Sequence, residues 1–596
     1  MGEPSLDKSL SEAPSERRLD SWKDIALYLH RDVTTVQRWE RQEAMPVHRH
    51  LHQKRGSVYA LSSELEAWQQ SRKLDVEEEV NGAVQTPPPT VWRTYWHRAV
   101  FRLATFGAVA IVTLAIVLLG LNVHGWRDRI LARKPKIQAL AVLPLVNLSD
   151  DPQQEYIADG MTEALITELG GISGPRVISR QSVMRYKGSK KSLQEIAREL
   201  NVDAVLEGAV EPSGDRVKVT LHLEQASPER QLWAQKYDRS MRDVLSLQDE
   251  IAHAVADGIQ FELSPQERAR LSRPRSVNPE AYADYLRGRS ITSAMYVTPL
   301  AEQDIERAIL YFKQAIGEDP GYAQAYAGLA YAYILLGNPL WASRSPKEAL
   351  SEARAAAGRA LELDPSLPYA HFSLAQSLEY EWNWPEAEKQ YKLALNLNPY
   401  DAVTHLEYGR FVQAVGENDE AMTQVRYAAE LDPLDIFVKG TQAYVTYVSR
   451  QYDVALKLFQ GLDDDHGLVW AYREKGMYPE AIAAWERWIR SDPSLPQQPH
   501  SLATLAGIYG LQGNNDKAEA LIKKLKEQAH HRYVSGFFFA EAYTGLGQRD
   551  QAINWLERAY QERDEWMVFG NSYPGLDPLR SEPRFQALMR RMNFPQ

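Results

Sequence analysis

The sequence predicts a multidomain protein with a small basic helical domain, one transmembrane helix, an α/β sandwich domain and a C-terminal α-solenoid. Three observations predict it. Prolines recur at a fixed spacing in the second half of the chain, one long segment carries no charge, and positive charge gathers near the N-terminus. At 596 residues the chain is too long for one hydrophobic core. It has no cysteine, which excludes disulfides, thiol catalysis and Cys-ligated zinc.

The solenoid is predicted from an internal repeat. The phrases LELDP, LNLNP and AELDP end at Pro365, Pro399 and Pro433, which lie 34 residues apart. One stripe of alanine and aromatic residues fits any amphipathic helix, but two consecutive units in register do not. Small residues let two helices approach closely, and the proline ends the second helix. The matching positions are Leu374, Ala375, Leu378, Ala387, Tyr391 and Ala394 in one unit, and Tyr408, Gly409, Val412, Ala421, Val425 and Ala428 in the next.

This period and these residues resemble the tetratricopeptide repeat (TPR) family. The resemblance implies an array of helix pairs over residues 279–596, with a concave face that binds a protein or peptide partner. The 45 residues between Pro320 and Pro365 indicate an insertion of about 11 residues near 338–346. Looser matches are Ala308, Phe312, Ala315, Ala443, Ala455, Phe459, Ala481, Trp485, Trp488, Pro493, Ala506, Tyr509, Ala518, Ala540, Tyr543, Ala552 and Ala559.

Residues 17–73 form the basic unit. They contain 11 Lys/Arg and 7 Asp/Glu, a net charge of +4 in a chain whose net charge is −11. Such a concentration is typical of nucleic-acid binding. A capping-box start at Ser21 precedes a first helix, and residues 34–41 form a second helix after a polar turn. Residues 47–60 are expected to form a hairpin, which a last helix follows.

This order of elements and the phrase WKDIALYL…TTVQRWER resemble the winged helix-turn-helix of the MerR/excisionase-like group. The resemblance implies binding to double-stranded DNA, with the second helix in the major groove and the hairpin near phosphates or the minor groove. A disordered tail is expected at 1–16 and a linker at 74–98, where an acidic run meets three prolines. The predicted DNA-binding residues are Thr34, Thr35, Gln37, Arg38, Arg41, Arg49, Lys54 and Arg55.

Two patterns in this unit have a second interpretation. His48, His50 and His52 alternate, so on a strand they would share one face, as metal ligands do. A polar hairpin surface is favoured, because no carboxylate lies in the stretch. The triplet at residues 30–32, His-Arg-Asp, spells the start of a kinase catalytic loop, but the other kinase motifs are absent from the sequence. No metal, cofactor or catalytic residue is therefore predicted.

The transmembrane helix is predicted over residues 99–123. From Leu103 to Val123 about 21 residues carry no charge. In a helix they span about 31 Å, close to the hydrocarbon thickness of a bilayer. Aromatic residues flank the segment on both sides, where membrane interfaces favour them. The alternative is a buried core helix, which rarely stays uncharged on every face.

An α/β sandwich domain is predicted over residues 137–263. Residues 137–145 have the composition of a buried strand, and residues 217–223 alternate apolar and polar side chains as a half-buried strand does. The phrases AVLPLVNLSDDPQQEYIADGMTEALITEL, VDAVLEGAVEPSGDRVKVTLHL and LWAQKYDR resemble the TolB-N/FlgO-like domain, which implies a binding or sensory role. Further strands are expected at 176–179, 204–210 and 232–237, and helices at 154–169, 193–200 and 244–261.

Three acids of this domain are candidate catalytic groups. Asp159 and Glu163 also fit the negative charge that a helix start favours, and Glu168 fits an exposed face. No histidine or second carboxylate pair lies nearby in the sequence. The protein is therefore not expected to be an enzyme.

Two functions fit these parts. One is a single-pass regulator of the bacterial inner membrane, similar to the ToxR/CadC architecture, with a cytoplasmic DNA-binding head, a periplasmic C-terminus and a possible homodimer on paired half-sites. The alternative is a membrane-anchored TPR scaffold whose N-terminal domain binds protein; a third is a signalling enzyme's truncated relative. Three arginines precede the apolar segment and five basic residues follow it. That asymmetry favours a cytoplasmic C-terminus, so the orientation stays open.

Overall fold

The computed structural model describes residues 18–42, 44–49, 58–69, 137–149, 151–294, 301–338, 345–492 and 495–595. They belong to two compact units, which divide between Ala132 and Arg133 and are described separately. The predicted tail at 1–16, the linker at 74–98 and the transmembrane segment at 99–123 lie outside the described residues. Within the described part of the chain, no helix has the length and apolar character that a membrane span needs.

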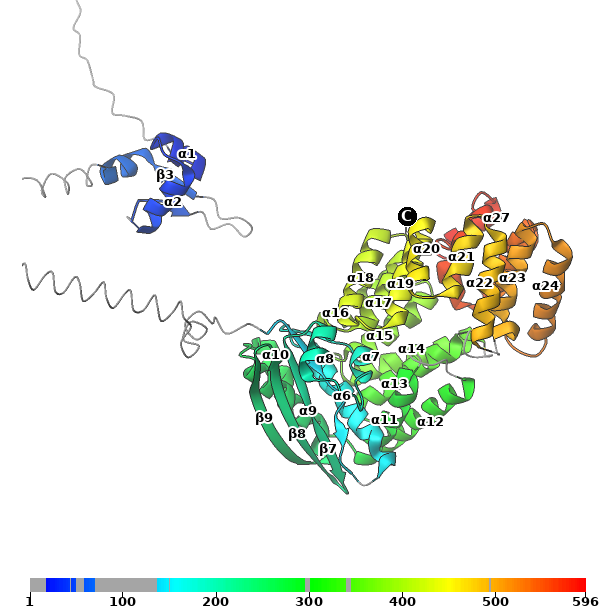
Figure 1. The fold of residues 1–596 in the computed structure, drawn as a ribbon, viewed down its shortest axis with the longest axis horizontal. Coiled ribbons are helices and arrows are strands. Elements are labelled where there is room, and N and C mark those ends of the chain that lie inside the picture. The colour runs from blue at the N-terminus through cyan, green and yellow to red at the C-terminus, as the bar shows by residue number, and fades with distance from the viewer. Residues whose placement is uncertain are drawn as a thin grey trace, which may run out of the picture. The chain divides into compact units, whose positions relative to one another are not determined.

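The first unit is a small domain of helices and short strands (Figure 1). Ser21 caps its first helix by accepting a hydrogen bond from the backbone of Asp24. Strand β3 lies between β1 and β2, antiparallel to both. A core that includes Ile25, Val36 and Leu65 joins these elements. They are β1 (Arg18–Leu19), α1 (Trp22–Tyr28), α2 (Val33–Gln42), β2 (His48–Arg49), β3 (Val58–Leu61) and a helix over 62–69.

The second unit begins with a mixed six-stranded sheet in the order β6-β4-β7-β8-β9, with β5 paired to β7. β4 is parallel to β6 and β7, whereas β7, β8 and β9 are antiparallel. β8 buries Val217, Val219, Leu221 and Leu223 and turns the residues between them outward, as the sequence predicts. The strands are β4 (Ala139–Val142), β5 (Val146–Asn147), β6 (Arg176–Val177), β7 (Ala204–Ser213), β8 (Arg216–Ala226) and β9 (Glu229–Ser240).

Helices cover both faces of this sheet. α6 and α9 share a core with β4, β7 and β8. α7 and α8 pack against the opposite side of β4 and β7. α7 and β5 are not predicted from the sequence, because each is short and lacks a clear period. The helices are α6 (Glu155–Gly170), α7 (Arg180–Met184), α8 (Leu193–Leu200), α9 (Val244–Gly258) and α10 (Pro265–Leu271), with 3₁₀ turns at Pro152–Gln154 and Met241–Asp243.

The described residues then form eight antiparallel helix pairs (Figure 1). Close approach within a pair needs small residues: a Cβ on Gly409 would lie 2.7 Å from Cγ2 of Val425. The pairs are α11 (Pro279–Ser293) with α12 (Glu302–Glu318), α13 (Ala323–Gly337) with α14 (Pro346–Leu363), α15 (Pro368–Tyr380) with α16 (Trp384–Leu397), α17 (Ala402–Ala414) with α18 (Asn418–Leu431), α19 (Ile436–Val448) with α20 (Tyr452–Gly461), α21 (Asp465–Glu474) with α22 (Tyr478–Ser491), α23 (Pro499–Leu511) with α24 (Asn515–Ala529), and α25 (Gly536–Gly545) with α26 (Arg549–Glu562).

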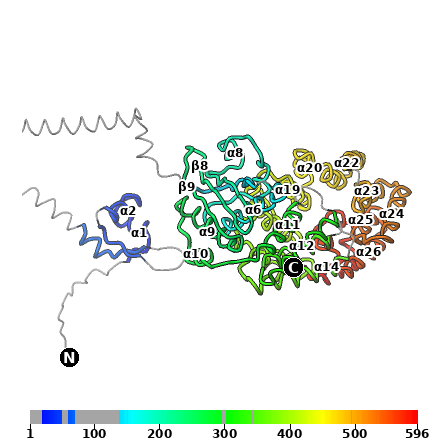
Figure 2. Tube along the Cα trace, turned by 90° about the horizontal axis from the view of Figure 1, so that it is seen from below, coloured from blue at the N-terminus to red at the C-terminus, as the bar shows by residue number. Residues whose placement is uncertain are grey.

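The chain after Glu562 is not a further repeat. The sequence predicts repeats as far as residue 596, and the structure corrects this. We call residues 563–595 the C-terminal segment. It consists of η6 (Glu565–Phe569), η7 (Pro574–Leu579) and α27 (Pro583–Arg591). Figure 2 shows this red segment beside helices from the other parts of the array.

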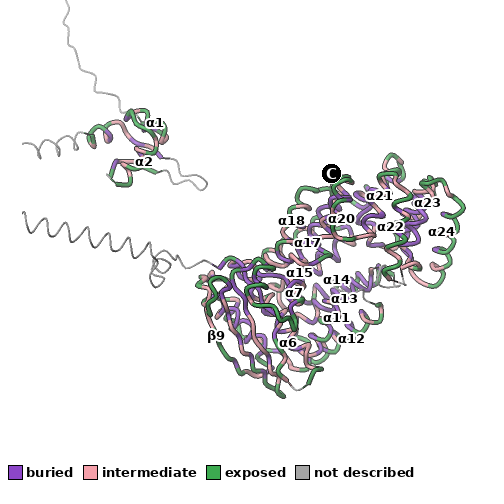
Figure 3. Tube along the Cα trace, viewed as in Figure 1, coloured by how far each residue is buried: buried purple, intermediate pink, exposed green. Residues whose placement is uncertain are grey.

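One hydrophobic core runs through the array, from α12 to the C-terminal segment. Figure 3 shows buried residues along the inside of the helices and exposed residues on the outside. Successive first helices contact one another, as in α13 with α15 and α23 with α25. At the second of these contacts the backbones meet directly, because a Cβ on Gly545 would lie 2.2 Å from the carbonyl oxygen of Gly507.

The α/β domain is fixed to the array by polar contacts. Asp432, at the end of α18, accepts hydrogen bonds from the hydroxyls of Ser179 and Ser182. The Ser182 hydroxyl also accepts from the backbone N–H of Leu434 at 3.0 Å. The Tyr400 hydroxyl donates to the carbonyl of Gly174 at 2.8 Å. The two domains are therefore parts of one compact unit.

Candidate protein-binding surface

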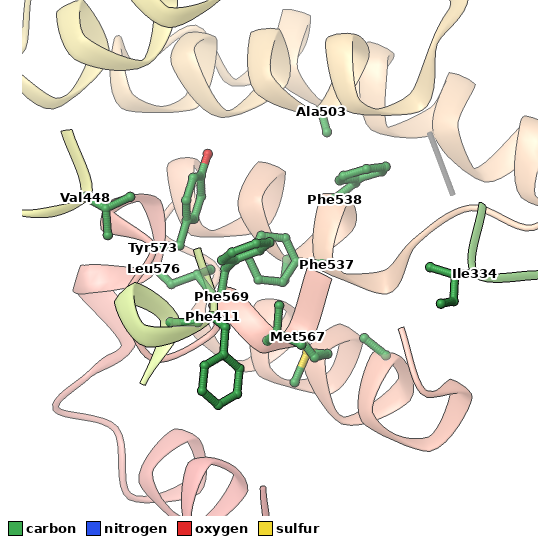
Figure 4. Close-up of a cluster of buried hydrophobic side chains, with 14 of the residues drawn as sticks. Ile334, Phe411, Val448, Ala503, Phe537, Phe538, Met567, Phe569, Tyr573 and Leu576 are labelled. Atoms are coloured by element: carbon green, nitrogen blue, oxygen red, sulfur yellow. The ribbon is translucent and has the colours of Figure 1, made fainter. Parts of the chain in front are cut away.

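The first helices of the repeats form an inner face, and the C-terminal segment covers its middle part. Figure 4 shows Phe569 and Leu576 of that segment among Phe411 of α17, Val448 of α19 and Phe537 of α25. Five hydrophobic residues of the segment are completely buried: Met567, Val568, Leu576, Leu579 and Met592. Burial of each such side chain contributes about 1.5–3 kcal/mol. The segment is therefore a structural part of the array.

Two turn residues hold this segment at a conformational cost. Trp382, Gly416 and Arg450 occupy the same turn in three successive pairs and all have positive φ, at 60°, 103° and 62°. Glycine suits this left-handed conformation, whereas the other two are strained. The Trp382 ring stacks on Tyr560 at 4.6 Å and lies 4.1 Å from the guanidinium carbon of Arg563.

The second strained residue reaches the same segment. Arg450 forms a 2.6 Å ion pair with Asp577 and donates a 2.7 Å hydrogen bond to the carbonyl of Ser572. Both side chains that replace glycine at this turn therefore bind the end of the array.

Carboxylates line the covered part of the inner face. Glu379 accepts a 2.7 Å hydrogen bond from Tyr391, and Glu407 pairs with Arg410 at 3.1 Å. Burial raises the pKa of Glu379 to about 8, and the charge of Glu407 adds to this effect. Burial also raises the pKa of Glu565, which the C-terminal segment contributes. This part of the face is closed, and burial there disfavours the charged forms of Glu379 and Glu565.

A cluster of aromatic side chains lies further along the array, between α21, α22 and α23. We call His466, Trp470, Trp488 and His500 the aromatic patch; all four are half-buried. The His466 ring stacks on Trp488 with centroids 4.0 Å apart and lies 4.1 Å from Trp470. His500 lies 5.4 Å from Trp488. Half-buried tryptophans are the residues that dominate many protein interfaces.

The two histidines of the patch are harder to protonate than a free imidazole. Burial lowers the pKa of His500 to about 4, and the nearby charge of Arg532 contributes. Burial lowers the pKa of His466 as well, and His500 adds to it. Neither ring forms a hydrogen bond with another described residue. Each imidazole therefore offers one donor and one acceptor to a ligand.

Unpaired polar groups border the aromatic patch. Arg532 forms no ion pair with any described residue, and its Nε atom has no hydrogen-bond partner among them. Burial lowers its pKa, while the charge of Glu302 acts in the opposite direction. The side-chain oxygens of Gln498 and Gln528 also lack partners within the described chain. Buried polar groups are normally hydrogen-bonded. The border can therefore bind polar groups of a partner beside an apolar side chain.

These findings limit how much of the predicted partner surface a partner can reach. The sequence predicts binding along the concave face of the array, but the C-terminal segment fills the part formed by α15, α17 and α19. Trp488, predicted as a repeat position of a second helix, packs half-buried against the core of the array and also stacks on His466. Sequence reasoning missed His466, His500 and Arg532, because only the fold brings their helices together.

The predicted DNA-binding residues of α2 fall into two groups. The hydroxyls of Thr34 and Thr35 both donate to Asp32, which caps the helix and whose pKa these bonds lower. Gln37 is half-buried, and Arg38 and Arg41 are exposed. The two arginines form no ion pair with any described residue, so of the predicted residues of α2 they are the best candidates for contacts with DNA.

The predicted hairpin residues are only partly described. Arg49 pairs with Glu40 at 2.9 Å, so a DNA contact would have to compete with that carboxylate. Lys54 and Arg55 lie outside the described residues, as do His50 and His52. His48 pairs with Glu64 at 2.7 Å and stacks on Tyr59. Within the described ranges no group of His, Asp and Glu is arranged to hold a metal.

The three candidate catalytic acids are all engaged by basic side chains. Asp159 pairs with Lys187 at 2.5 Å, and Glu163 pairs with Arg289 of α11. The sequence predicts that Glu168 lies on an exposed face. The structure corrects this, because the side chain is only 12% exposed. It pairs at 2.7 Å with both Arg270 and Arg275, and these partners lower its pKa against the effect of burial.

Comparisons with known proteins agree with the repeats. A sequence model of the tetratricopeptide repeat family matches residues 300–339, which include the whole of α12 and α13. A putative adenylate cyclase 3 of Rhizobium meliloti is 33% identical over 254 residues, 43% of this chain and 42% of that protein. The TPR repeat-containing protein YpiA of Bacillus subtilis is 23% identical over 258 residues, 38% of this chain and 56% of that protein. The chain thus spans about half the length of each.

Solved structures include similar arrays. A thermophilic TPR protein of Thermus thermophilus is 20% identical, with a TM-score of 0.25, over 35% of this chain and 97% of that chain. The Cut9–Hcn1 hetero-tetramer of the APC/C is 14% identical, with a TM-score of 0.33, over 54% of this chain and 56% of that chain. The protein is a multidomain chain with a C-terminal TPR array, and TPR repeats generally bind protein partners.

Proposed function

We propose that this protein is a TPR scaffold that binds a protein partner at the aromatic patch and acts by binding, not by catalysis. The observation that carries the proposal is the stack of Trp470, His466 and Trp488 beside the unpaired Arg532. A partner would insert an apolar side chain against the two indoles and present a carboxylate to the arginine. Such a contact combines a desolvated aromatic centre with a charged hydrogen bond.

The covered part of the inner face supports this choice of surface. A partner that entered between α15 and α19 would have to displace the buried Met567, Val568 and Leu576. Their combined burial, at about 1.5–3 kcal/mol for each side chain, opposes that exchange. The aromatic patch requires no such displacement.

Co-purification tests the proposal. The tagged full-length chain is expressed in its native host beside W488A, R532E and the control R558E, which makes the same charge reversal at an exposed arginine of α26. A partner should co-purify in constant proportion with the wild type and R558E, and be lost from W488A and R532E. If the partner is recovered equally with all four chains, the proposal that the aromatic patch binds it is refuted. Circular dichroism melts establish that each variant is folded.

DNA binding by the N-terminal unit is a second candidate, which would make the protein a transcriptional regulator. One observation favours it: Arg38 and Arg41 are exposed on α2 beside a short antiparallel sheet, the arrangement that places a helix in a major groove. The charge of +4 on residues 17–73 would add an attraction to phosphate that weakens with salt. A homodimer would strengthen binding to paired half-sites.

A membrane location is proposed with either function. It rests on the uncharged residues 103–123 alone. We propose a bacterial inner-membrane protein with a cytoplasmic N-terminus, and a periplasmic C-terminus if the head binds DNA. Alkaline phosphatase fused at Ala139 should then be active, and a cytoplasmic reporter fused there should be silent. The opposite pattern of reporter activities contradicts this orientation. Recovery of the full chain in the soluble fraction contradicts the predicted transmembrane helix.

A further inference from the structure

A cavity of about 480 Å³ lies in the α/β domain, away from the aromatic patch. Gln235 and Tyr237 of β9 form one wall, and Glu250, His253 and Asp257 of α9 form another. The segment 271–274, after α10, closes the third side. Cavities of this size are typical of small-molecule sites.

One buried hydroxyl at this cavity has no partner. Tyr237 is 3% exposed, and its hydroxyl forms no hydrogen bond with any described residue. Burial, with a contribution from the charge of Glu250, raises its pKa to about 12, so the hydroxyl stays protonated. The Tyr237 side chain lines the cavity together with Glu250. A buried tyrosine hydroxyl usually finds a partner, so an absent ligand is the simplest acceptor.

The charges around the cavity are largely balanced. Glu250 pairs with Arg239 at 2.9 Å, Asp257 lies 3.3 Å from His253, and Arg273 adds a further positive charge to the lining. The two carboxylates oppose an anionic ligand, and their basic neighbours reduce the attraction for a cation. What remains is a set of acceptors and donors: two carboxylates, an imidazole, the Arg273 guanidinium, the Gln235 amide and the Tyr237 hydroxyl. Vicinal hydroxyl groups satisfy such a set.

We propose that this cavity binds a neutral polyhydroxylated small molecule of the size of a mono- or disaccharide, with Tyr237 donating to one of its oxygen atoms. Arg275 follows directly after the segment 271–274 that forms the third wall. It pairs with both Glu168 of α6 and Asp249 of α9. The bound molecule would therefore touch the segment that connects the α/β domain to the first helix of the array. This site is independent of the partner surface.

Calorimetric titration of the full-length chain tests the proposal. The probes are glucose, galactose, maltose and sucrose, with spermidine and inorganic phosphate as cationic and anionic comparisons. At least one sugar should bind, and Y237F should weaken it at least tenfold. The control K236A changes the neighbouring exposed residue of β9, whose side chain points to the opposite face, and should bind as the wild type does.

The stability of Y237F provides a second readout. Because the hydroxyl lacks a partner in the protein, removing it should leave the melting temperature without sugar unchanged or raise it. Concentrated sugars stabilise proteins non-specifically, so the sugar-dependent shift is taken as the difference between wild type and Y237F. The proposal is overturned if no sugar binds, if only spermidine or phosphate binds, if Y237F binds sugar as well as wild type, or if Y237F melts markedly lower.

Discussion

The indole nitrogen of Trp384 donates a 2.8 Å hydrogen bond to the carbonyl of Met592, and its ring stacks on Phe594 at 4.7 Å. Trp384 begins the second helix of the third pair, so this contact fastens the end of the chain to the middle of the array. The indole is 1% exposed. The C-terminal segment therefore contributes to the stability of repeats that precede it by many helices.

Replacement of this indole tests that role. W384A should lower the free energy of unfolding by about 3–5 kcal/mol, because it empties a fully buried site. W384F keeps most of the ring and loses the hydrogen bond, so its cost should be smaller, although the unpaired Met592 carbonyl adds to it. Urea unfolding followed by circular dichroism measures both. A cost below about 1 kcal/mol for W384A would show that the segment is only loosely held.

A second prediction concerns the joint between the α/β domain and the array. S182A removes one donor to Asp432 and the acceptor of the Leu434 N–H. Leaving these buried groups unsatisfied should cost about 1–3 kcal/mol. Limited proteolysis should cut the variant faster between the two domains than the wild type. S189A, at an exposed serine, is the control; equal cleavage of all three proteins would contradict the importance of this joint.

Stability should depend on pH through Glu379. Its folded pKa is raised to about 8 by burial, whereas the unfolded group titrates near its ordinary value. The folded state thus holds a proton that the unfolded state loses, and stability falls as pH rises through this window. The slope is at most about 1.4 kcal/mol per pH unit for one such proton. Burial shifts Asp432 in the same direction, to a pKa of about 6.

Chemical unfolding at pH 5, 7 and 9 measures whether the free energy of unfolding falls as the pH rises. E379Q should lose part of the decline and be more stable than the wild type at pH 9, because it never ionises. E417Q, at an exposed position, should follow the wild type. A wild-type stability that rises steadily from pH 5 to 9 contradicts the buried, protonated state of Glu379.

The DNA-binding candidate makes a prediction about salt. The full-length chain should bind duplex DNA at low salt, and R38A/R41A should bind more weakly and reduce the slope of log affinity against log salt by about 2. Fluorescence anisotropy over a range of salt concentrations measures this. K23A, at an exposed lysine of α1, is the matched control. Absence of binding at low salt removes this candidate and leaves the scaffold.

The sequence was sufficient for much of the array, because the 34-residue period places Gly409 and Val425 where two helices must nearly touch. Alternation at Val217 and Val219 likewise predicts β8. The C-terminal segment could not be predicted in this way. Its first part forms only short 3₁₀ turns, and the segment is stabilised by residues such as Arg450 and Trp384 that are distant in the chain.

The aromatic patch was harder to predict from the sequence, because its residues are also distant in the chain. His466, Trp488 and His500 belong to three helices, and no local pattern marks them as neighbours. Trp488 fits the repeat pattern of a second helix, which does not reveal its stack on His466. The prediction for Glu168 is wrong, since a glutamate on an amphipathic helix is expected outside, yet Arg270 and Arg275 hold it inside.

Site-specific photocrosslinking in the native host tests the central claim most directly. A photoreactive phenylalanine analogue replaces Trp488 in the aromatic patch or, as the control, Trp555 of α26, which is half-buried against Phe539. The account predicts one defined protein adduct from position 488 and none from position 555. No adduct from position 488, or the same adduct from both positions, would contradict the proposal that this patch binds a protein partner.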